Sequence, residues 1–290
     1  MASPEFHKLV AYMAANPMPP VDRETMRRNM AAFGSNAKLP DGVSVETPTD
    51  APVPTKLYTP ADALPGMVLF AHGGGFTLGS AASHGHVAGW LAHAARRPVA
   101  IFDYRLAPEH PFPAALEDYR EMFGWAMQRG NAPSQVALAG DSAGANLSVS
   151  VAANGDVARP GAIVCLSPSF DLAGYLAIDP GSISDQSVDA GSIADGFRLY
   201  LGDTPPDHPR VSPNRAPLRD LPPTLVQIAE TEVFAPGAHD FVARAKAAGA
   251  VVELDVWSEM MHDWHWYAPR LPEAREAIER AGAFIARHLG

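Results

Sequence analysis

The sequence is poor in cysteine, in long apolar runs and in clustered positive charge, and each of these absences excludes a class of protein. A single cysteine, Cys165, in 290 residues rules out an internal disulfide framework. No segment contains the roughly 18 consecutive apolar residues that a transmembrane helix requires. The formal net charge of -10, without any run rich in Lys and Arg, disfavours nucleic acid and anionic membranes as partners.

The remaining composition is that of an ordinary globular enzyme, with 47% hydrophobic and 19% charged residues. The N-terminal segment lacks the basic flank and the continuous apolar stretch of a secretory signal, so we expect a cytoplasmic protein. The length suits one large core, and we expect a single domain over residues 1–290. Cys165 lies in the apolar run 162–166, where we expect it to pack as a small buried side chain.

Short β-branched apolar runs alternate with longer segments of helical period, which is typical of a parallel sheet covered by helices on both faces. The pattern predicts an α/β fold with an eight-stranded, mostly parallel sheet. Its strands are expected at 43–47, 56–59, 67–71, 99–104, 135–139, 162–166, 224–229 and 251–257, and its helices at about 84–95, 114–129, 143–154, 237–248 and 272–288.

Two regions do not fit this alternation. Residues 1–40 are interrupted by several prolines, and residues 172–210 form a long stretch rich in Gly, Asp and Ser. Long loops in compact domains are usually functional or locally structured. We therefore expect both regions to contribute to a small helical cap, with helices near 21–33 and 190–201; the alternative is a frayed tail and a surface excursion.

The segment Gly140-Asp141-Ser142-Ala143-Gly144 has the pattern G-x-S-x-G between a predicted strand and a predicted helix. A strand-to-helix turn this sharp strains the serine backbone and admits only small residues two positions to either side. The turn exposes the Ser142 hydroxyl, and the helix that follows directs free N–H groups toward developing negative charge. Ser142 is therefore the predicted nucleophile.

A second glycine-rich segment, His72-Gly73-Gly74-Gly75-Phe76, follows the strand at 67–71. Glycines let the backbone approach a substrate closely and present N–H groups without obstruction. We expect the N–H groups of Gly73, Gly74 and Ala143 to receive the oxyanion of a tetrahedral intermediate. The competing interpretation, a phosphate-binding loop, lacks both glycine-rich phosphate motifs.

In enzymes whose serine lies in a G-x-S-x-G turn of this kind, the catalytic residues follow the chain order nucleophile, acid, histidine. This order places the base after the last strand and the acid after the strand before it. Two histidines lie in the expected loop, and His262 is the predicted base with His265 in reserve. The acid that orients the imidazole is predicted to be Glu232. Glu230, or Asp240 reaching in from the next helix, stays open as an alternative.

Taken together, these segments resemble the bacterial hormone-sensitive lipase family of esterases from about residue 55 to the C-terminus. The matching segments are HGGGF at 72–76, DYRLAPEHPFPAALED at 103–118, GDSAGAN at 140–146, LSPSFDL at 166–172 and SPNRAPLRDLPPTLVQ at 212–227. The resemblance implies a capped α/β-hydrolase fold that acts on short-chain acyl esters without a cofactor or metal, with Glu232 and His262 at the acid and base positions. Asp103 and Glu109, in the second matching segment, are expected to brace the loops around the site.

The sequence departs from the family at the acid, where Glu232-Val233-Phe234 stands in place of the usual Asp-Pro-Leu. Glutamate performs the same task with a longer side chain, so we expect a carboxylic ester hydrolase with a Ser-Glu-His triad. An amidase or deacetylase with the same triad and a non-catalytic ligand-binding relative are the alternatives.

The substrate pocket is expected to include Phe76, Met260 and Met261, unless these residues belong to the core. The predicted partner is a small ester. An edge strand at 251–257 also offers a surface for a homodimer across a two-fold axis.

Overall fold

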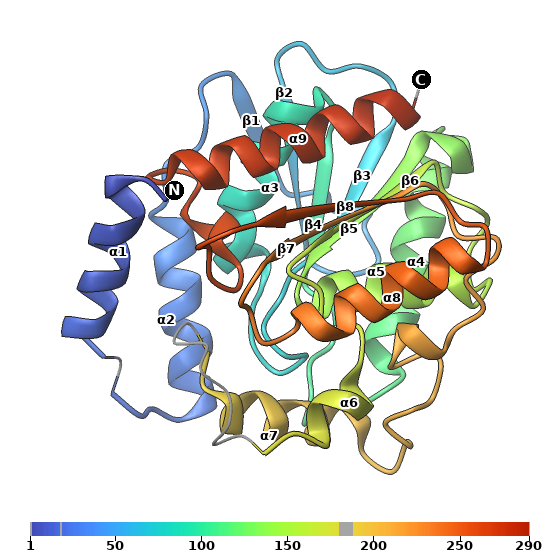
Figure 1. Ribbon diagram of the computed structural model, residues 1–290. Helices are drawn as coiled ribbons and strands as arrows, with labels where there is room; N and C mark the ends of the chain where they lie inside the picture. Colours follow the sequence, from blue (N-terminus) through green and yellow to red (C-terminus); the bar gives the residue numbers. More distant parts are fainter. Residues whose placement is uncertain (1, 18, 180–187, 290) are drawn as a thin grey trace.

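One eight-stranded sheet organises the chain (Figure 1), in the order β1-β2-β4-β3-β5-β6-β7-β8. The computed structural model describes residues 2–17, 19–179 and 188–289. β1 pairs antiparallel with β2, and β2 pairs antiparallel with β4, whereas all other neighbours are parallel. The predicted mostly parallel sheet is confirmed, and every strand lies within two residues of its expected position. The strands are β1 (Val43–Glu46), β2 (Thr55–Pro60), β3 (Met67–Ala71), β4 (Val99–Phe102), β5 (Val136–Asp141), β6 (Ala162–Leu166), β7 (Thr224–Ala229) and β8 (Val252–Trp257).

The five helices expected from the apolar period are present. They are α3 (Ala81–Ala95), α4 (Ala114–Gln128), α5 (Ala143–Ala153), α8 (Ala235–Ala247) and α9 (Pro272–His288). α3 begins three residues earlier than predicted because Ser80 and Ser83 form a capping box. α8 begins two residues earlier because Pro236 is tolerated in the first helical turn, where its missing N–H has no partner to lose.

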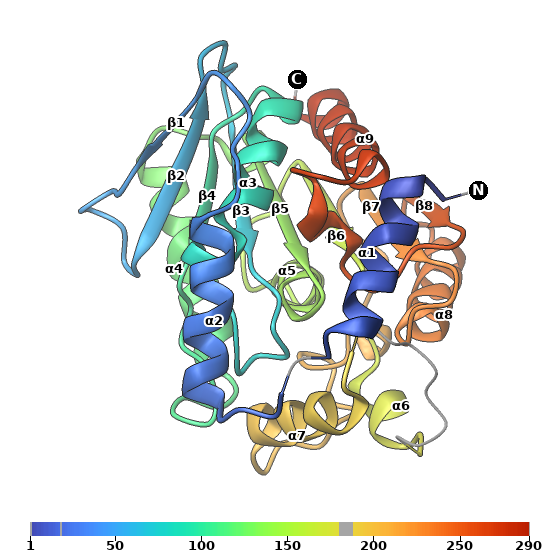
Figure 2. The same cartoon turned by 90° about the vertical axis from the view of Figure 1, so that its left-hand side faces the viewer.

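The helices form a layer on each face of the sheet (Figures 1 and 2). The side chains of β3 show the division, because successive residues of a strand point to opposite faces. Val68 and Phe70 belong to the hydrophobic cluster that includes α3 and α9. Leu69 and Ala71 belong to the cluster that includes α4, α5 and α8. Cys165 is fully buried in the latter, as predicted.

Additional helices lie outside these two layers. α2 (Arg23–Ser35) and α7 (Ala190–Leu201) match predicted helices, whereas α1 (Pro4–Ala15) and the short α6 (Leu172–Leu176) were not predicted. α6 and α7 lie at one end of the molecule, near one end of α2 (Figures 1 and 2). Residues 180–187 of the predicted cap segment fall outside the described residues.

α1 was not predicted although Phe6, Val10 and Met13 follow a helical spacing, because the prolines at 17, 19 and 20 interrupt the pattern just beyond it. Phe6 is its one buried residue, and capping by Ser3 with Pro4 in the first turn favours its start.

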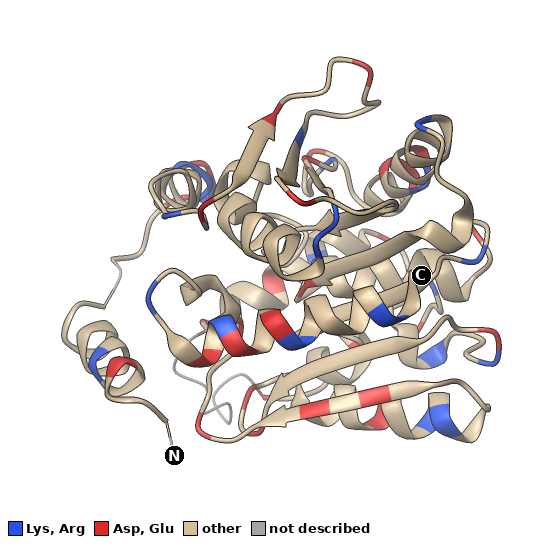
Figure 3. Ribbon diagram, turned by 90° about the horizontal axis from the view of Figure 1, so that it is seen from above, with Lys and Arg blue, Asp and Glu red and all other residues tan. Residues whose placement is uncertain are grey.

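Charged residues of both signs are interspersed along α9 (Figure 3). Arg280 and Arg287 of this helix pair with Asp255 and Glu253 of β8 at 3.0 and 2.9 Å. These contacts fix the last helix to the edge strand. Among the helices of the described residues, none combines the length and apolar character needed to cross a bilayer.

Candidate active site

Ser142 occupies the turn between β5 and α5 in a strained backbone conformation, with φ 48° and ψ -112°. Its N–H donates to the carbonyl oxygen of Leu166 at 2.9 Å, which holds the turn against β6. A Cβ atom at Gly144 would collide with the carbonyl oxygen of Ala71, and one at Gly140 would collide with the backbone of Gly144. The sharp turn predicted from the G-x-S-x-G pattern is therefore present, and the two glycines are needed for the packing predicted.

His262, in the loop after β8, lies between Ser142 and Glu232. Its Nε2 atom is 3.1 Å from Ser142 Oγ, and its Nδ1 atom is 3.2 Å from Glu232 Oε2. The imidazole is 7% exposed and the Glu232 side chain is fully buried, so little water competes for these contacts. The three residues come from loops after three different parallel strands, β5, β7 and β8, whose carboxyl ends lie on the same side of the sheet.

The alternative acids and the reserve histidine lie elsewhere. Glu230 is exposed to solvent. Asp240 accepts hydrogen bonds from Asn214 and Arg244, both at 2.8 Å. His265 is buried, with its Nε2 atom 3.2 Å from the side-chain oxygen of Gln227. Of the candidates considered, the structure brings Glu232 to His262, and the longer glutamate side chain spans the distance.

Burial and neighbouring charges shift the pKa values of the site residues in opposite directions. Burial raises the pKa of Glu232 above its usual value, although the His262 imidazole and the Ser167 hydroxyl oppose the shift. Burial by itself lowers the pKa of His262, but the Asp263 carboxylate and then Glu232 outweigh it and hold the pKa well above its ordinary value. The imidazolium form of His262 is therefore strongly stabilised.

The oxyanion donors differ in part from the prediction. The Gly73 N–H donates to Asp141 Oδ1 at 2.9 Å, so the prediction that it receives an oxyanion is wrong. Among the described residues, the N–H groups of Gly74, Gly75 and Ala143 have no hydrogen-bond acceptor. Gly74 and Gly75 adopt φ values of 116° and 57°, which favour glycine. Gly75 is thus a candidate donor that the sequence did not single out.

Asp141 connects the nucleophile turn to the glycine-rich loop. Besides accepting the Gly73 N–H, its carboxylate lies 3.1 Å from His84 Nε2, and the other nitrogen of His84 is 2.7 Å from the Ser83 hydroxyl. Burial would raise the pKa of Asp141, but the neighbouring histidines and the Gly73 N–H outweigh it and lower the pKa. Asp141 thereby fixes the position of both loops.

The bracing roles expected for Asp103 and Glu109 are confirmed. Asp103 Oδ1 accepts the Ala81 N–H at 2.5 Å at the start of α3. Glu109 pairs with Arg27 of α2 at 2.9 Å, and the same arginine donates to the carbonyl oxygens of Thr77 and Ala107. These contacts attach α2 to the loop after the glycine-rich segment.

A group of aromatic side chains adjoins His262 and the glycine-rich loop. Phe234 packs edge-on against the His262 ring, with centroids 5.0 Å apart, and Phe197 of α7 lies 6.1 Å from Phe234 and 5.9 Å from Phe76. Phe76 also stacks on Tyr200 at 3.7 Å. The predicted pocket residue Phe76 thus joins this group. Met260 and Met261 pack instead with the hydrophobic cluster that includes α3 and α9.

A cavity of about 170 Å³ borders these aromatic residues. It is lined by Phe170, Asp171, Gly174, Tyr175, Ile178, Val233, Phe234, Pro236 and Gly237. Phe234 therefore borders this cavity and also contacts the His262 ring.

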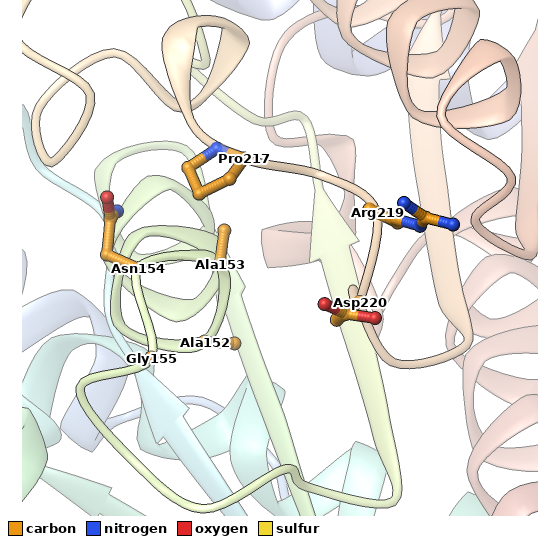
Figure 4. A pocket seen from close by; sticks show the side chains of 7 residues that line it. All are labelled: Ala152, Ala153, Asn154, Gly155, Pro217, Arg219 and Asp220. Carbon is orange, nitrogen blue, oxygen red and sulfur yellow. The ribbon is translucent and has the colours of Figure 1, made fainter.

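A second cavity, of about 280 Å³, lies away from the site (Figure 4). Its lining includes Asn154 and Gly155 just beyond α5, together with Arg219 and Asp220 before β7. Since α5 starts next to Ser142 and runs away from it, this cavity lies toward the opposite end of the strands from Ser142. None of its lining residues belongs to the site described above.

Three residues near the imidazole were not anticipated as site residues from the sequence: Asp263, Ser167 and Phe234. Asp263 Oδ2 lies 3.1 Å from His262 Nε2, and its N–H donates to Ser167 Oγ at 3.1 Å. The departure at Glu232-Val233-Phe234 was the one available signal for Phe234. No spacing rule distinguishes the other two.

A family model described as the alpha/beta hydrolase fold matches residues 68–266. The match spans more than half of the chain and includes the glycine-rich loop, the nucleophile turn and the loop that carries His262. The chain therefore belongs to the α/β-hydrolase family.

Individual relatives narrow this assignment. The chain is 40% identical over 227 residues to an acetyl-hydrolase of Streptomyces hygroscopicus, covering 77% of this chain and 76% of that protein. It superposes with a TM-score of 0.91 and 34% identity on an esterase of the bacterial hormone-sensitive lipase family, over the whole of both chains. A solved structure of EstE5 soaked with p-nitrophenyl butyrate gives a TM-score of 0.90 and 32% identity, over 99% of both chains. The chain is thus a serine ester hydrolase of the hormone-sensitive lipase type.

Proposed function

We propose that the protein cleaves short-chain acyl esters with Ser142 as nucleophile, His262 as general base and acid, and Glu232 as the orienting carboxylate. The proposal is carried by one observation. The His262 imidazole lies 3.1 Å from Ser142 Oγ on one side and 3.2 Å from Glu232 Oε2 on the other. Such a relay activates a serine hydroxyl that is otherwise a weak nucleophile.

In the acylation step, neutral His262 takes the proton from Ser142 Oγ through Nε2 as the oxygen attacks the ester carbonyl carbon. The oxyanion forms opposite the N–H groups of Gly74, Gly75 and Ala143. Preorganised donors of this kind contribute about 3 kcal/mol each to the transition state. The imidazolium then protonates the leaving alkoxide, and the acyl group stays on Ser142.

In the deacylation step, His262 removes a proton from water, the hydroxide attacks the acyl carbon, and the proton returns to Ser142 as the acid leaves. Glu232 accepts the Nδ1–H throughout, which keeps Nε2 directed toward the reacting atoms. The base is active only when His262 is neutral. Because the pKa of His262 is well above its ordinary value, activity should rise with pH through that elevated pKa.

A short acyl chain is supported by the size of the apolar space near the site. The cavity behind Phe234 measures about 170 Å³. A cavity of roughly 150 Å³ holds a molecule the size of benzene, so this space suits a group of a few carbons. The acetyl-hydrolase and the EstE5 structure soaked with p-nitrophenyl butyrate point to the same range.

We also propose that α2 and α7 act as the cap of a single catalytic domain. α7 packs closely against the glycine-rich loop at Gly196, where an added Cβ atom would lie 3.1 Å from the Gly75 carbonyl oxygen. The Nε–H of Arg27, in α2, donates to the carbonyl oxygen of Thr77 at 2.8 Å, in the loop that follows the same glycines. Both helices thus sit where they limit access to Ser142.

The assignment is tested with Ser142→Ala and a panel of p-nitrophenyl esters from acetate to octanoate. The parent protein should show its highest kcat/KM on acetate or butyrate and should be labelled by a fluorophosphonate. The variant should lose both properties while its circular dichroism and thermal midpoint stay unchanged. Retained turnover in a folded variant would refute the triad, and a preference for octanoate would refute the short-chain assignment. Matched esters and anilides separate an esterase from an amidase.

A homodimer through β8 is a further part of this proposal. β8 forms the edge of the sheet, and Val251 and Val256 at this edge are 61% and 44% exposed. Pairing of two copies across a two-fold axis would cover both side chains and the unpaired backbone groups. Analytical ultracentrifugation should show a dimer that Val256→Lys converts to a monomer; a monomeric parent would contradict this expectation.

A further inference from the structure

Asp263 places a second carboxylate on the imidazole that Glu232 already contacts. Its Oδ2 atom lies 3.1 Å from His262 Nε2, the same nitrogen that lies 3.1 Å from Ser142 Oγ. Glu232 contacts the other nitrogen, Nδ1. The triad roles account for the contacts of Ser142 and Glu232, but they leave the contact of Asp263 unexplained.

The chain holds Asp263 in this position by a left-handed backbone conformation. Its φ is 54°, in the left-handed region that, besides glycine, short polar residues such as Asp and Asn adopt most readily. The hydrogen bond from its N–H to Ser167 Oγ, at 3.1 Å, fixes the turn. Residues other than glycine in this conformation are often found at functional sites. Here the conformation directs the side chain back toward the imidazole of the preceding residue.

The carboxylate has few other polar contacts. Its side chain is 22% exposed. Among the described residues, its Oδ1 atom has no hydrogen-bond partner, which leaves the contact of Oδ2 with His262 Nε2 as the main interaction of this carboxylate. A carboxylate that is mostly shielded from water interacts strongly with its one partner because little water screens the charge.

Charged and titratable groups from several elements face this pair. Glu232 approaches from the loop after β7, Asp141 from the end of β5 and His84 from α3. His265 and Tyr267 approach from the 3-10 helix η4 (Trp264–Tyr267). Burial keeps His265 neutral by lowering its pKa to about 3, so it adds no positive charge. Burial raises the pKa of Glu232 and of Asp263, and the His262 imidazole opposes the shift in each, so the imidazolium faces a carboxylate on both nitrogens.

We infer that Asp263 is a positioning residue whose carboxylate pairs with the Nε2 side of the His262 imidazolium and thereby sets the pH at which Ser142 is activated. The inference rests on the proposed triad. In the resting enzyme the bound proton must leave Nε2 before the nitrogen accepts the proton of Ser142. During acylation the same carboxylate stabilises the imidazolium as it forms, without taking up a proton itself.

The Asp263 carboxylate slows the reaction by keeping His262 protonated in the resting enzyme, and it speeds the reaction by stabilising the imidazolium during acylation. These opposite effects on the rate can be measured. An opposite charge within about 4–6 Å shifts a pKa by 1–3 units. Asp263→Asn removes the charge, and Asn tolerates left-handed backbone. The acid limb of the kcat/KM profile should then move at least one pH unit lower. Because a weaker base transfers protons less readily, the plateau should fall, by about threefold for a Brønsted coefficient near one-half.

The profiles of the parent and Asp263→Asn should therefore cross. The variant is expected to be about threefold faster than the parent below both pKa values and slower at high pH. A residue with a merely structural role would lower the rate at every pH and leave the limb in place. If Asn disturbs the loop, Asp263→Gly, which adopts the same φ without strain, carries the same expectation.

Two control variants accompany this comparison. Asp62→Asn removes one negative charge from an exposed side chain that pairs with Arg96, so its profile should coincide with that of the parent. Asp263→Glu restores the carboxylate and should return the limb toward its original pH. Coincident profiles for the parent and Asp263→Asn would overturn the inference.

An NMR titration of the His262 imidazole, assigned by its loss in His262→Gln, measures the same effect without catalysis. The pKa of His262 should fall in Asp263→Asn by the same amount as the kinetic limb. If Ser142→Ala retained activity while the His262 pKa fell in Asp263→Asn, the proposed triad would be wrong but the interaction between Asp263 and His262 would stand. If Ser142→Ala is inactive and the pKa does not move, the triad stands and the role of Asp263 is refuted.

Discussion

Glu232→Gln is expected to lower kcat by roughly 10³- to 10⁴-fold with little change in KM. The variant keeps the shape of the side chain but removes its charge. If the amide group donates to Nδ1, that nitrogen must carry its lone pair and Nε2 must carry the hydrogen. The imidazole then presents a donor to Ser142 where an acceptor is needed.

The magnitude follows from the contact itself. Charges 3.2 Å apart, the distance between His262 Nδ1 and Glu232 Oε2, interact by about 5 kcal/mol at an effective dielectric constant near 20. The Glu232 side chain is fully buried, so solvent screens this interaction little. Each 1.4 kcal/mol of transition-state stabilisation is about tenfold in rate, which gives the stated range.

The assay is steady-state hydrolysis of p-nitrophenyl butyrate across a pH series, with Glu230→Gln and Asp240→Asn as matched controls. Both controls remove a carboxylate from the same segment of chain at sites that do not contact His262. Each should retain activity within a few-fold of the parent. Full activity in folded Glu232→Gln, or a large loss in Glu230→Gln, would refute the assignment of the acid.

Phe234→Leu should open the cavity behind this residue and raise the kcat/KM for hexanoate relative to acetate by roughly tenfold; an unchanged ratio would exclude Phe234 as the barrier. Burial raises the pKa of the Cys165 thiol, so iodoacetamide should label it only after unfolding, and rapid labelling of the native protein would contradict this. Burial also lowers the pKa of His72 and of His265 to about 3, against 6.5 for a free histidine. The unfolded state therefore binds more protons below pH 6.5, and each residue should reduce the free energy of unfolding by about 1.4 kcal/mol per pH unit there. Between pH 6.5 and 5, the free energy of unfolding measured by urea titration should fall less for His265→Gln than for the parent. Equal decreases would contradict the lowered pKa of His265.

Much of the fold was predictable because it depends on local patterns. Strands such as Met67–Ala71 are short, β-branched or apolar, and bounded by turn residues, and they appear where that pattern places them. Ser142 was predictable for a related reason, since few sequences other than G-x-S-x-G fit a strand-to-helix turn this tight. The chain order then led to His262.

Local patterns also had definite limits. α1 was missed although Phe6, Val10 and Met13 follow a helical spacing, because the prolines at 17, 19 and 20 interrupt the pattern just beyond it and Phe6 alone is fully buried. Glu230 and Glu232 lie two residues apart in one turn, and spacing does not say which side chain is directed inward. The structure exposes the first and buries the second.

The sequence by itself determined the class of fold, the nucleophile turn and the loop that carries the base, because each depends on the conformations that a few adjacent residues allow. Tertiary structure decided which groups meet: His262 with Ser142 across 120 positions of the chain, and the Gly73 N–H with Asp141 across 68. It also decided that Asp263 turns its carboxylate onto Nε2. Contacts of this kind depend on how distant segments pack around one sheet, and adjacent residues carry no record of that packing.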